Sequence, residues 1–246
     1  ALFGIKIENN ERDIEKLVSD EMRITPPEKR AELFMKLMYS AMYAYNPNTD
    51  KTGRLSEDYE HETFAGIKAD DAVLEIAVVF LRYDHEGWLM RDRTVLYRVE
   101  PFPGANLEQA ALDFTGINPD DPNREAVTEN EALSNLFDQV KKAVKHHECT
   151  RAVMVAHNAH FDLGFLTAAT LRCEMIKKNP FHQFSCFDTV SLAGLAYGQT
   201  VLAKACSAAG IPFDNRKAHS ADYDAEKTAD LFCKIVNTWR ECEKQA

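Results

Sequence analysis

The fold of this chain is indicated most clearly by residues 153–162, VMVAHNAHFD. Their apolar beginning belongs to a strand predicted over residues 151–156, of the buried kind found in parallel sheets. The polar turn that follows ends the strand and leads to Asp162, at the start of a helix predicted over residues 162–175. Short apolar strands followed by helices predict a layered α/β domain.

A second stretch, residues 218–224 (AHSADYD), places His219 five residues before Asp224, again where a helix begins. An aspartate at a helix start is commonly a cap, and a lone histidine is commonly structural, so each residue alone is ordinary. Two carboxylates and a histidine gathered by strand and helix ends can hold divalent metal ions and activate a water. The combination indicates a phosphodiester hydrolase.

Other patterns extend this picture on both sides. Strands are predicted over residues 73–81 and 94–99, and helices over residues 106–114, 129–145, 189–196, 201–209 and 221–239. The first 60 residues differ, because helical apolar faces over residues 11–22 and 25–45 lead into a polar stretch at 49–62. We therefore predict an atypical N-terminal segment (1–59, a strand plus a helical pair) and a catalytic domain (60–242).

Composition excludes several classes of protein. The 246 residues carry a net charge of −10, which argues against indiscriminate nucleic-acid binding. The six cysteines are scattered without a CxxC pair, so we expect free thiols and a cytoplasmic location rather than a zinc site. No apolar run of about 18 residues is present, so no membrane span is expected.

Over residues 63–239 the chain resembles the ribonuclease T family of DnaQ-like 3′–5′ exonucleases. The signals shared by the superfamily are HNAHFD at 157–162 and His219 with Asp224. More specific signals are VEPF (99–102), GAN (104–106), FTGI (114–117), NPFH (179–182), FDT (187–189), LAYGQTVL (195–202), LFC (231–233) and IVN (235–237). The resemblance implies a ribonuclease H-like exonuclease fold, in which helices flank a mixed central sheet.

The resemblance also implies roles for the site residues. Asp162 and Asp224 match metal ligands, His219 matches the general base, and Asp188 matches a nearby acidic residue that we expect to support the site rather than ligate. Two Mg²⁺ ions, with Mn²⁺ as a substitute, would lie about 3.5–4 Å apart and hold the scissile phosphate. Clustered carboxylates repel one another without such cations.

The implied partner is the 3′ end of tRNA and other stable RNAs, or of single-stranded DNA. Phe114, Phe161 and Phe184 match phenylalanines on which the terminal bases stack, although a single phenylalanine is more often a core residue. A matching basic patch grips the body of the RNA across a homodimer. Its residues here are Lys145, Arg151 and Lys177.

The first acidic motif departs from the family, which has Asp-x-Glu-Thr after an apolar strand. One registration places Glu60 and Glu62 there, after a stretch (LSEDY, 55–59) that is too polar for a central strand. Another places Lys6 and Glu8 there, after the apolar residues 3–5. We favour Glu62 with Glu60, and both registrations stay open. A lysine at the aspartate position would weaken the site, because it puts an ammonium where a dication belongs.

Three functions follow from these patterns. The leading one is a Mg²⁺-dependent 3′–5′ exoribonuclease with a histidine general base. The first alternative is a catalytically weakened RNA-binding protein on the same scaffold, because of the altered first motif. The second is an editing subunit for DNA synthesis, against which the family-specific segments count.

Overall fold

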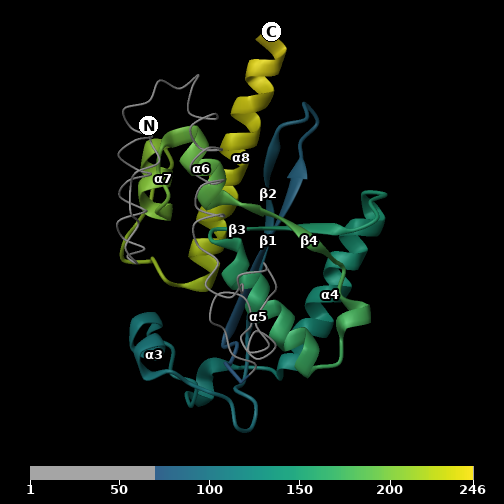
Figure 1. The fold of residues 1–246 in the computed structure, drawn as a ribbon, viewed down its shortest axis with the longest axis vertical. Coiled ribbons are helices and arrows are strands. Elements are labelled where there is room, and N and C mark those ends of the chain that lie inside the picture. The colour runs from purple at the N-terminus through teal and green to yellow at the C-terminus, as the bar shows by residue number, and fades with distance from the viewer. Residues whose placement is uncertain (1–69, 246) are drawn as a thin grey trace, which may run out of the picture.

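The computed structural model describes residues 70–245, whose arrangement is shown in Figure 1. The predicted segment 1–59, Glu60 and Glu62, and the alternative Lys6 and Glu8 lie outside the described residues. The elements, in chain order, are β1 (Glu75–Tyr83), β2 (Leu89–Arg98), α3 (Gln109–Thr115), η3 (Pro122–Arg124), α4 (Glu129–His146), β3 (Ala152–Ala156), α5 (Ala159–Arg172), η4 (Ile176–Lys178), β4 (Phe181–Asp188), α6 (Thr189–Tyr197), α7 (Leu202–Ala208) and α8 (Ala221–Gln245).

The strands form two pairs within the described part of the chain. β1 and β2 make an antiparallel hairpin, and β3 lies parallel to β4 with Ala156 opposite Asp188. Because the carboxyl ends of parallel strands meet at one edge, Asp188 lies beside the turn that leads from β3 to Asp162. This edge is the foundation of the site.

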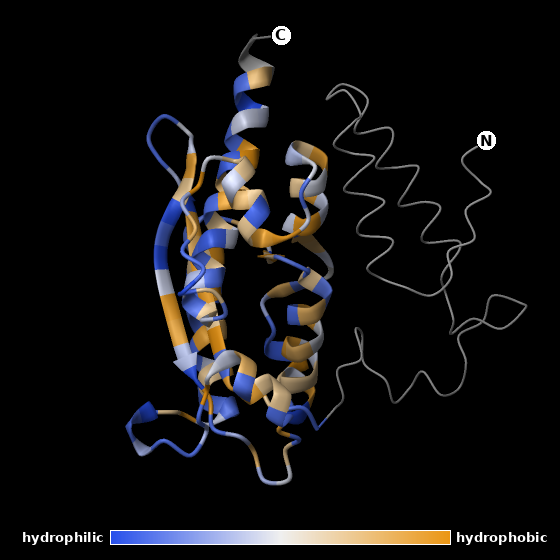
Figure 2. Cartoon of the chain, turned by 90° about the vertical axis from the view of Figure 1, so that its left-hand side faces the viewer, coloured by the Kyte–Doolittle hydropathy of each residue, from blue (hydrophilic) through white to orange (hydrophobic). Residues whose placement is uncertain are grey.

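Helices cover both faces of the strands. On one face, residues of β1 (Ile76, Val78, Phe80) pack against a buried cluster from α4 and α5 that includes Leu133, Leu136, Phe137, Val140 and Ala169. On the other face, Leu81 and Val155 pack against Phe232 and Cys233 of α8. Figure 2 shows hydrophobic and hydrophilic residues alternating around α8, as expected of a helix with one packed and one solvated face.

The start of α4 shows how local sequence fixes an element. The Thr128 hydroxyl accepts a hydrogen bond from the Glu131 N–H (3.3 Å), and the Glu131 carboxylate accepts one from the Thr128 N–H (3.1 Å). This capping box satisfies donors that a helix start otherwise leaves free. Full burial of a side chain such as Leu133 or Phe137 adds roughly 1.5–3 kcal/mol each.

The structure confirms the predicted α/β alternation and corrects some boundaries. The strand β4 was not predicted, because FHQFSCFD mixes polar and apolar residues without a clear period. The helix expected from Asp162 begins at Ala159 and ends at Arg172, because Asn158 takes up the left-handed conformation that closes the turn. Among the described helices, none has the length and apolar character needed to cross a membrane.

Candidate active site

The turn after β3 positions Asp162. Asn158 has φ = 71°, so the chain reverses sharply and α5 begins at the next residue. Asp162 therefore lies in the first turn of α5, where the exposed backbone N–H groups and the helix dipole favour a negative charge.

Asp188 and His157 hold this turn in place. One oxygen of the Asp188 carboxylate accepts hydrogen bonds from the backbone N–H of Asn158 (3.0 Å) and of Val190 (2.9 Å). The His157 ring bonds the Thr189 hydroxyl through Nδ1 (2.9 Å) and the Thr200 carbonyl through Nε2 (2.9 Å). Burial lowers the pKa of His157, so the neutral ring donates from Nε2 and accepts at Nδ1.

The carboxyl group of Asp162 has an altered proton affinity. Asp162 is an exposed residue, but protein atoms surround much of its carboxylate group. This partial loss of water raises the pKa of Asp162 from 3.8 to about 6, and the negative charge of Asp188 adds to the rise. A cation nearby would reverse that effect, since it favours the ionised form.

Asp224 lies in the first turn of α8, and only one of its two carboxylate oxygens has a hydrogen-bond partner among the described residues. Oδ2 accepts the backbone N–H of His219 at 3.1 Å. Oδ1 is buried and has no hydrogen-bond partner among the described residues. Burial raises the pKa of Asp224, and the His219 N–H opposes that rise. Burying a carboxylate oxygen without a partner costs free energy of folding. A metal ion or a hydrogen-bond donor at this oxygen would remove that cost.

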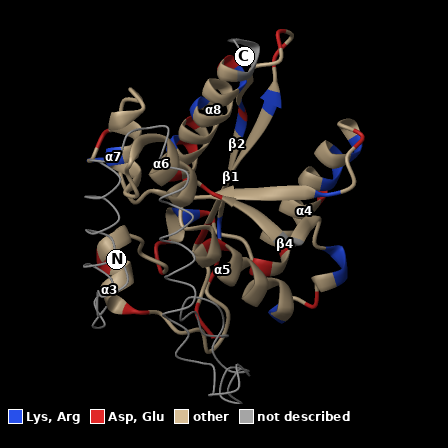
Figure 3. Ribbon diagram, turned by 45° about the horizontal axis from the view of Figure 1, so that its top comes forward, with Lys and Arg blue, Asp and Glu red and all other residues tan. Residues whose placement is uncertain are grey.

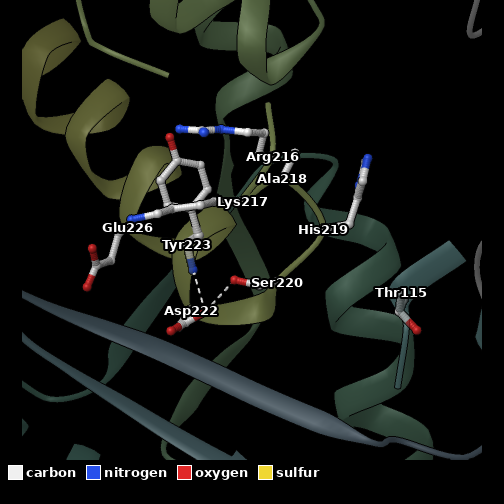
Figure 4. Close-up of a pocket in the computed structure, with 9 residues that line it drawn as sticks. All are labelled: Thr115, Arg216, Lys217, Ala218, His219, Ser220, Asp222, Tyr223 and Glu226. Carbon is white, nitrogen blue, oxygen red and sulfur yellow. Dashed lines mark hydrogen bonds between the residues drawn. The ribbon is translucent and has the colours of Figure 1, made fainter. Parts of the chain in front are cut away.

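His219 stands beside a hollow of about 520 Å³. Its backbone has φ = 76°, and its ring centroid lies 4.1 Å from that of Phe114 with a 49° tilt. Figure 4 shows the hollow, in which Asp222 accepts hydrogen bonds from the Ser220 hydroxyl (2.6 Å) and the Tyr223 N–H (2.8 Å). Asp222 is thus already paired, in contrast to Asp224.

The metal ligands are incomplete within residues 70–245. No group of three or more histidine, cysteine, aspartate or glutamate side chains in that range is arranged to hold a metal ion. Asp162, in the first turn of α5, and Asp224, in the first turn of α8, carry the carboxylate oxygens that Mg²⁺ prefers as ligands. The third carboxylate was predicted at Glu60 with Glu62 or at Glu8, outside the described residues.

The predicted RNA-binding residues are placed as follows. Phe114 and Phe161 are 65% and 48% exposed, so neither is a core residue. The side chain of Phe184 lies outside what the structure describes. The basic residues Lys145, Arg151 and Lys177 are all exposed and come from the end of α4, the start of β3 and η4. Figure 3 shows the blue of Lys and Arg on these elements, on the side away from α3.

Sequence reasoning missed the support that His157 and Thr189 give to the site. The histidine was visible in the turn after β3, but nothing in the sequence marks Thr189 and Thr200 as its partners. Their sequence separation of 32 and 43 residues from His157 explains this, because only the fold brings them together.

Comparisons with known proteins show the family of this chain. The RNase T exonuclease family matches residues 58–232. Ribonuclease T of Marinobacter nauticus is 65% identical over 171 residues, which cover 70% of this chain and 77% of that protein. A solved 3′-exonuclease structure, described as showing 3′-end-specific recognition of a histone mRNA stem-loop, is 14% identical with a TM-score of 0.46, covering 94% of this chain and 86% of that one. That likeness is too distant to add to the argument. The chain therefore belongs to the RNase T family of exonucleases, and with this the expected ribonuclease H-like α/β fold is confirmed.

Proposed function

We propose that this exonuclease trims the 3′ ends of tRNA and other stable RNAs, and of single-stranded DNA, by two-metal hydrolysis with His219 as general base. Its general activity, that of a 3′–5′ exoribonuclease and hence a phosphodiester hydrolase, follows from the family. The observation that carries the mechanism is the Asp224 carboxylate, which has a buried, unpaired oxygen and accepts the N–H of His219.

The carboxylates fit a divalent metal site. Asp162 and Asp224 would hold the ions, with a third carboxylate from Glu62 and Glu60, or from Glu8. Bound Mg²⁺ or Mn²⁺ supplies Lewis-acid stabilisation of the charge that develops on the phosphate. With a pKa of about 6, Asp162 is mostly ionised at neutral pH and free to ligate. Asp188 is committed to two backbone N–H groups, which supports a positioning role.

His219 would take a proton from the attacking water at a ring nitrogen. A histidine titrates close to neutral pH, so it can hold that proton and release it in each cycle. The hydrogen bond from its backbone N–H to Asp224 keeps the residue next to a metal ligand. Its exposed ring has access to solvent, from which the water comes.

The exposed aromatic and basic residues suit a single-stranded RNA end. Stacking on an aromatic ring contributes about 1–3 kcal/mol per base and tolerates any base. The exposed rings of Phe161 and Phe114 suit this role, and Phe184 joins them by resemblance. Lys145, Arg151 and Lys177 are exposed and lie at the end of α4, next to β3 and in η4. Figure 3 shows Lys and Arg on these elements, on the side away from α3. This separation supports a homodimer in which one subunit grips the RNA body while the other cuts its end.

Two further features belong to the proposal. Residues 60–242 would form the exonuclease domain and residues 1–59 an appended segment. All six cysteines are free thiols, which suits a cytoplasmic enzyme.

The test is cleavage of an RNA hairpin with a single-stranded 3′ tail. In Mg²⁺ we expect stepwise shortening of the tail that stops near the duplex, and no shortening after chelation of the metal. Binding of the hairpin without any shortening would overturn the proposal and favour the RNA-binding alternative. Preference for mismatched DNA over the RNA tail would favour the editing alternative.

A further inference from the structure

The short helix α3 makes few packing contacts with the rest of the described residues. None of its seven residues is buried, and it stands apart from α4 and α8 (Figure 1). It ends at Gly116, whose φ of 70° and N–H bond to the Leu112 carbonyl (2.8 Å) close the helix. Among the described residues, its ring contact with another element is the one between Phe114 and His219.

The ring of His219 has equally few constraints. Its backbone is fixed, since the N–H binds Asp224 and φ is 76°. Within residues 70–245 no hydrogen bond is made by its ring nitrogens, and the residue is exposed. Within residues 70–245 the imidazole packs on the ring of Phe114, at 4.1 Å between centroids, and this contact restricts its direction.

We propose that Phe114 is a positioning residue for His219, besides any stacking it provides for RNA. One face of its ring packs on the imidazole, while the side chain is 65% exposed and so keeps surface for a nucleobase. A base that stacks on that free surface immobilises Phe114 and, through it, His219. Binding of the RNA end thus aligns the general base. The inference rests on the proposed function, because His219 is the base there.

A base-free substrate separates positioning from stacking. Stacking alone predicts that cleavage of a phosphodiester without a nucleobase is indifferent to Phe114. Positioning predicts that such cleavage falls when Phe114 is shortened, because His219 is then misdirected. Hairpins whose last two or last three 3′ residues are abasic are two substrates of this kind, because their 3′ ends carry no ring that could stack on Phe114.

The variants are Phe114→Leu, the conservative Phe114→Tyr, and Tyr83→Leu as a matched loss of an exposed aromatic ring on the β1–β2 hairpin. We expect Phe114→Leu to lower kcat about tenfold on the base-free substrates, with KM within about twofold. The limb of the pH–rate profile that His219→Gln removes is expected to flatten in Phe114→Leu and to return in Phe114→Tyr. Tyr83→Leu is expected to match the unaltered protein.

An independent readout is the NMR signal of the His219 ring, assigned by its loss in His219→Gln. Phe114→Leu is expected to shift this signal, because the ring current of Phe114 disappears, whereas Tyr83→Leu leaves it in place. Unchanged kcat on the base-free substrates, or an unshifted signal, would overturn the inference. If the unaltered protein cleaves neither the base-free substrates nor an ordinary RNA tail, the proposed function fails, and the catalytic part of the inference fails with it.

Discussion

The two sides of the site are built differently. On the β3 side, Asp188 accepts the N–H of Asn158 in the turn before Asp162 and the N–H of Val190 in α6, and the His157 ring binds Thr189 and Thr200. Ala159 and Thr189, which flank those bonds, are fully buried at 0% exposure. On the α8 side, His219 is exposed, and within residues 70–245 it is held by one N–H bond and one ring contact.

The difference matches the two tasks of the proposed mechanism. A pair of metal ions tolerates little movement of its ligands, so the carboxylate side has to be rigid before substrate arrives. A general base acts only once the scissile phosphate is in place, so its final alignment can wait for RNA. The site therefore combines a rigid side around Asp162 with an adjustable general base, His219. The following experiments test this difference.

The largest effect is expected from the two proposed metal ligands, one on each side of the site. Asp162→Asn on the β3 side or Asp224→Asn on the α8 side removes such a ligand while keeping the shape of the side chain. Loss of metal-based stabilisation of several kcal/mol corresponds to a fall of at least about 1,000-fold in the rate of tail shortening. The measurement is the rate of 3′-tail removal on a denaturing gel.

A matched control is Asp138→Asn, which removes an exposed carboxylate of α4. It is expected to cleave as the unaltered protein does. Mn²⁺ should raise the melting temperature of the unaltered protein and of this control, but raise that of Asp224→Asn less, because binding stabilises only a protein that binds. Equal protection of all three would remove Asp224 from the metal site.

On the adjustable side, His219→Gln is expected to lower kcat by about 100- to 10,000-fold, the usual contribution of general acid–base catalysis. RNA affinity should change little, because the imidazole is not a proposed RNA contact. Fluorescence anisotropy with a labelled hairpin in Ca²⁺ measures the affinity, and single-turnover cleavage measures the rate. A loss of affinity equal to the loss of rate would place His219 in binding instead.

A smaller effect is expected from Asp188→Ala, which leaves the backbone N–H groups of Asn158 and Val190 without their acceptor. Loss of such a cap costs about 1 kcal/mol. The melting temperature should fall by about 2–4 °C for a domain of this size. Cleavage should fall about tenfold, because the turn at Asn158 that positions Asp162 is then less firmly held. Asp188→Asn, which keeps an acceptor oxygen, should recover most of both; if it behaves as the alanine variant does, the charge of Asp188 matters more than its hydrogen bonds.

Sequence reasoning reached those parts of the site that depend on local order. The strand before His157, the helix start at Asp224 and the spacing of His219 are all written in short stretches, and the structure places them as elements of an α/β fold. The helix predicted over residues 129–145 likewise follows from a local pattern and is found as α4 (Glu129–His146). Such features follow from hydrophobic periodicity and turn chemistry.

What the sequence did not reveal depends on long-range contact. The strand β4 is recognisable as one only beside β3, since its own pattern lacks a clear period. The bond from His157 to Thr200 and the ring contact of Phe114 with His219 join residues far apart in the chain. The altered pKa of Asp162 likewise arises from the atoms that crowd it, which no spacing predicts.

The last effect concerns the pH dependence of stability, and it tests the crowding around Asp162 directly. In the folded protein the pKa of Asp162 is about 6, above its ordinary value of 3.8, so the folded state binds this proton more tightly than the unfolded chain does. The resulting stabilisation is fully present below about pH 4 and is lost as the pH rises through about 6. Without metal, Asp162→Asn should therefore melt higher than the unaltered protein at pH 7.5, with the difference shrinking towards pH 4. Thermal melts in chelator at both pH values measure this, and saturating Mn²⁺ at pH 7.5 should reverse the order, because the cation then stabilises the ionised carboxylate. A difference in melting temperature that stays constant between the two pH values would mean that the Asp162 carboxylate is well solvated and that burial does not raise its pKa.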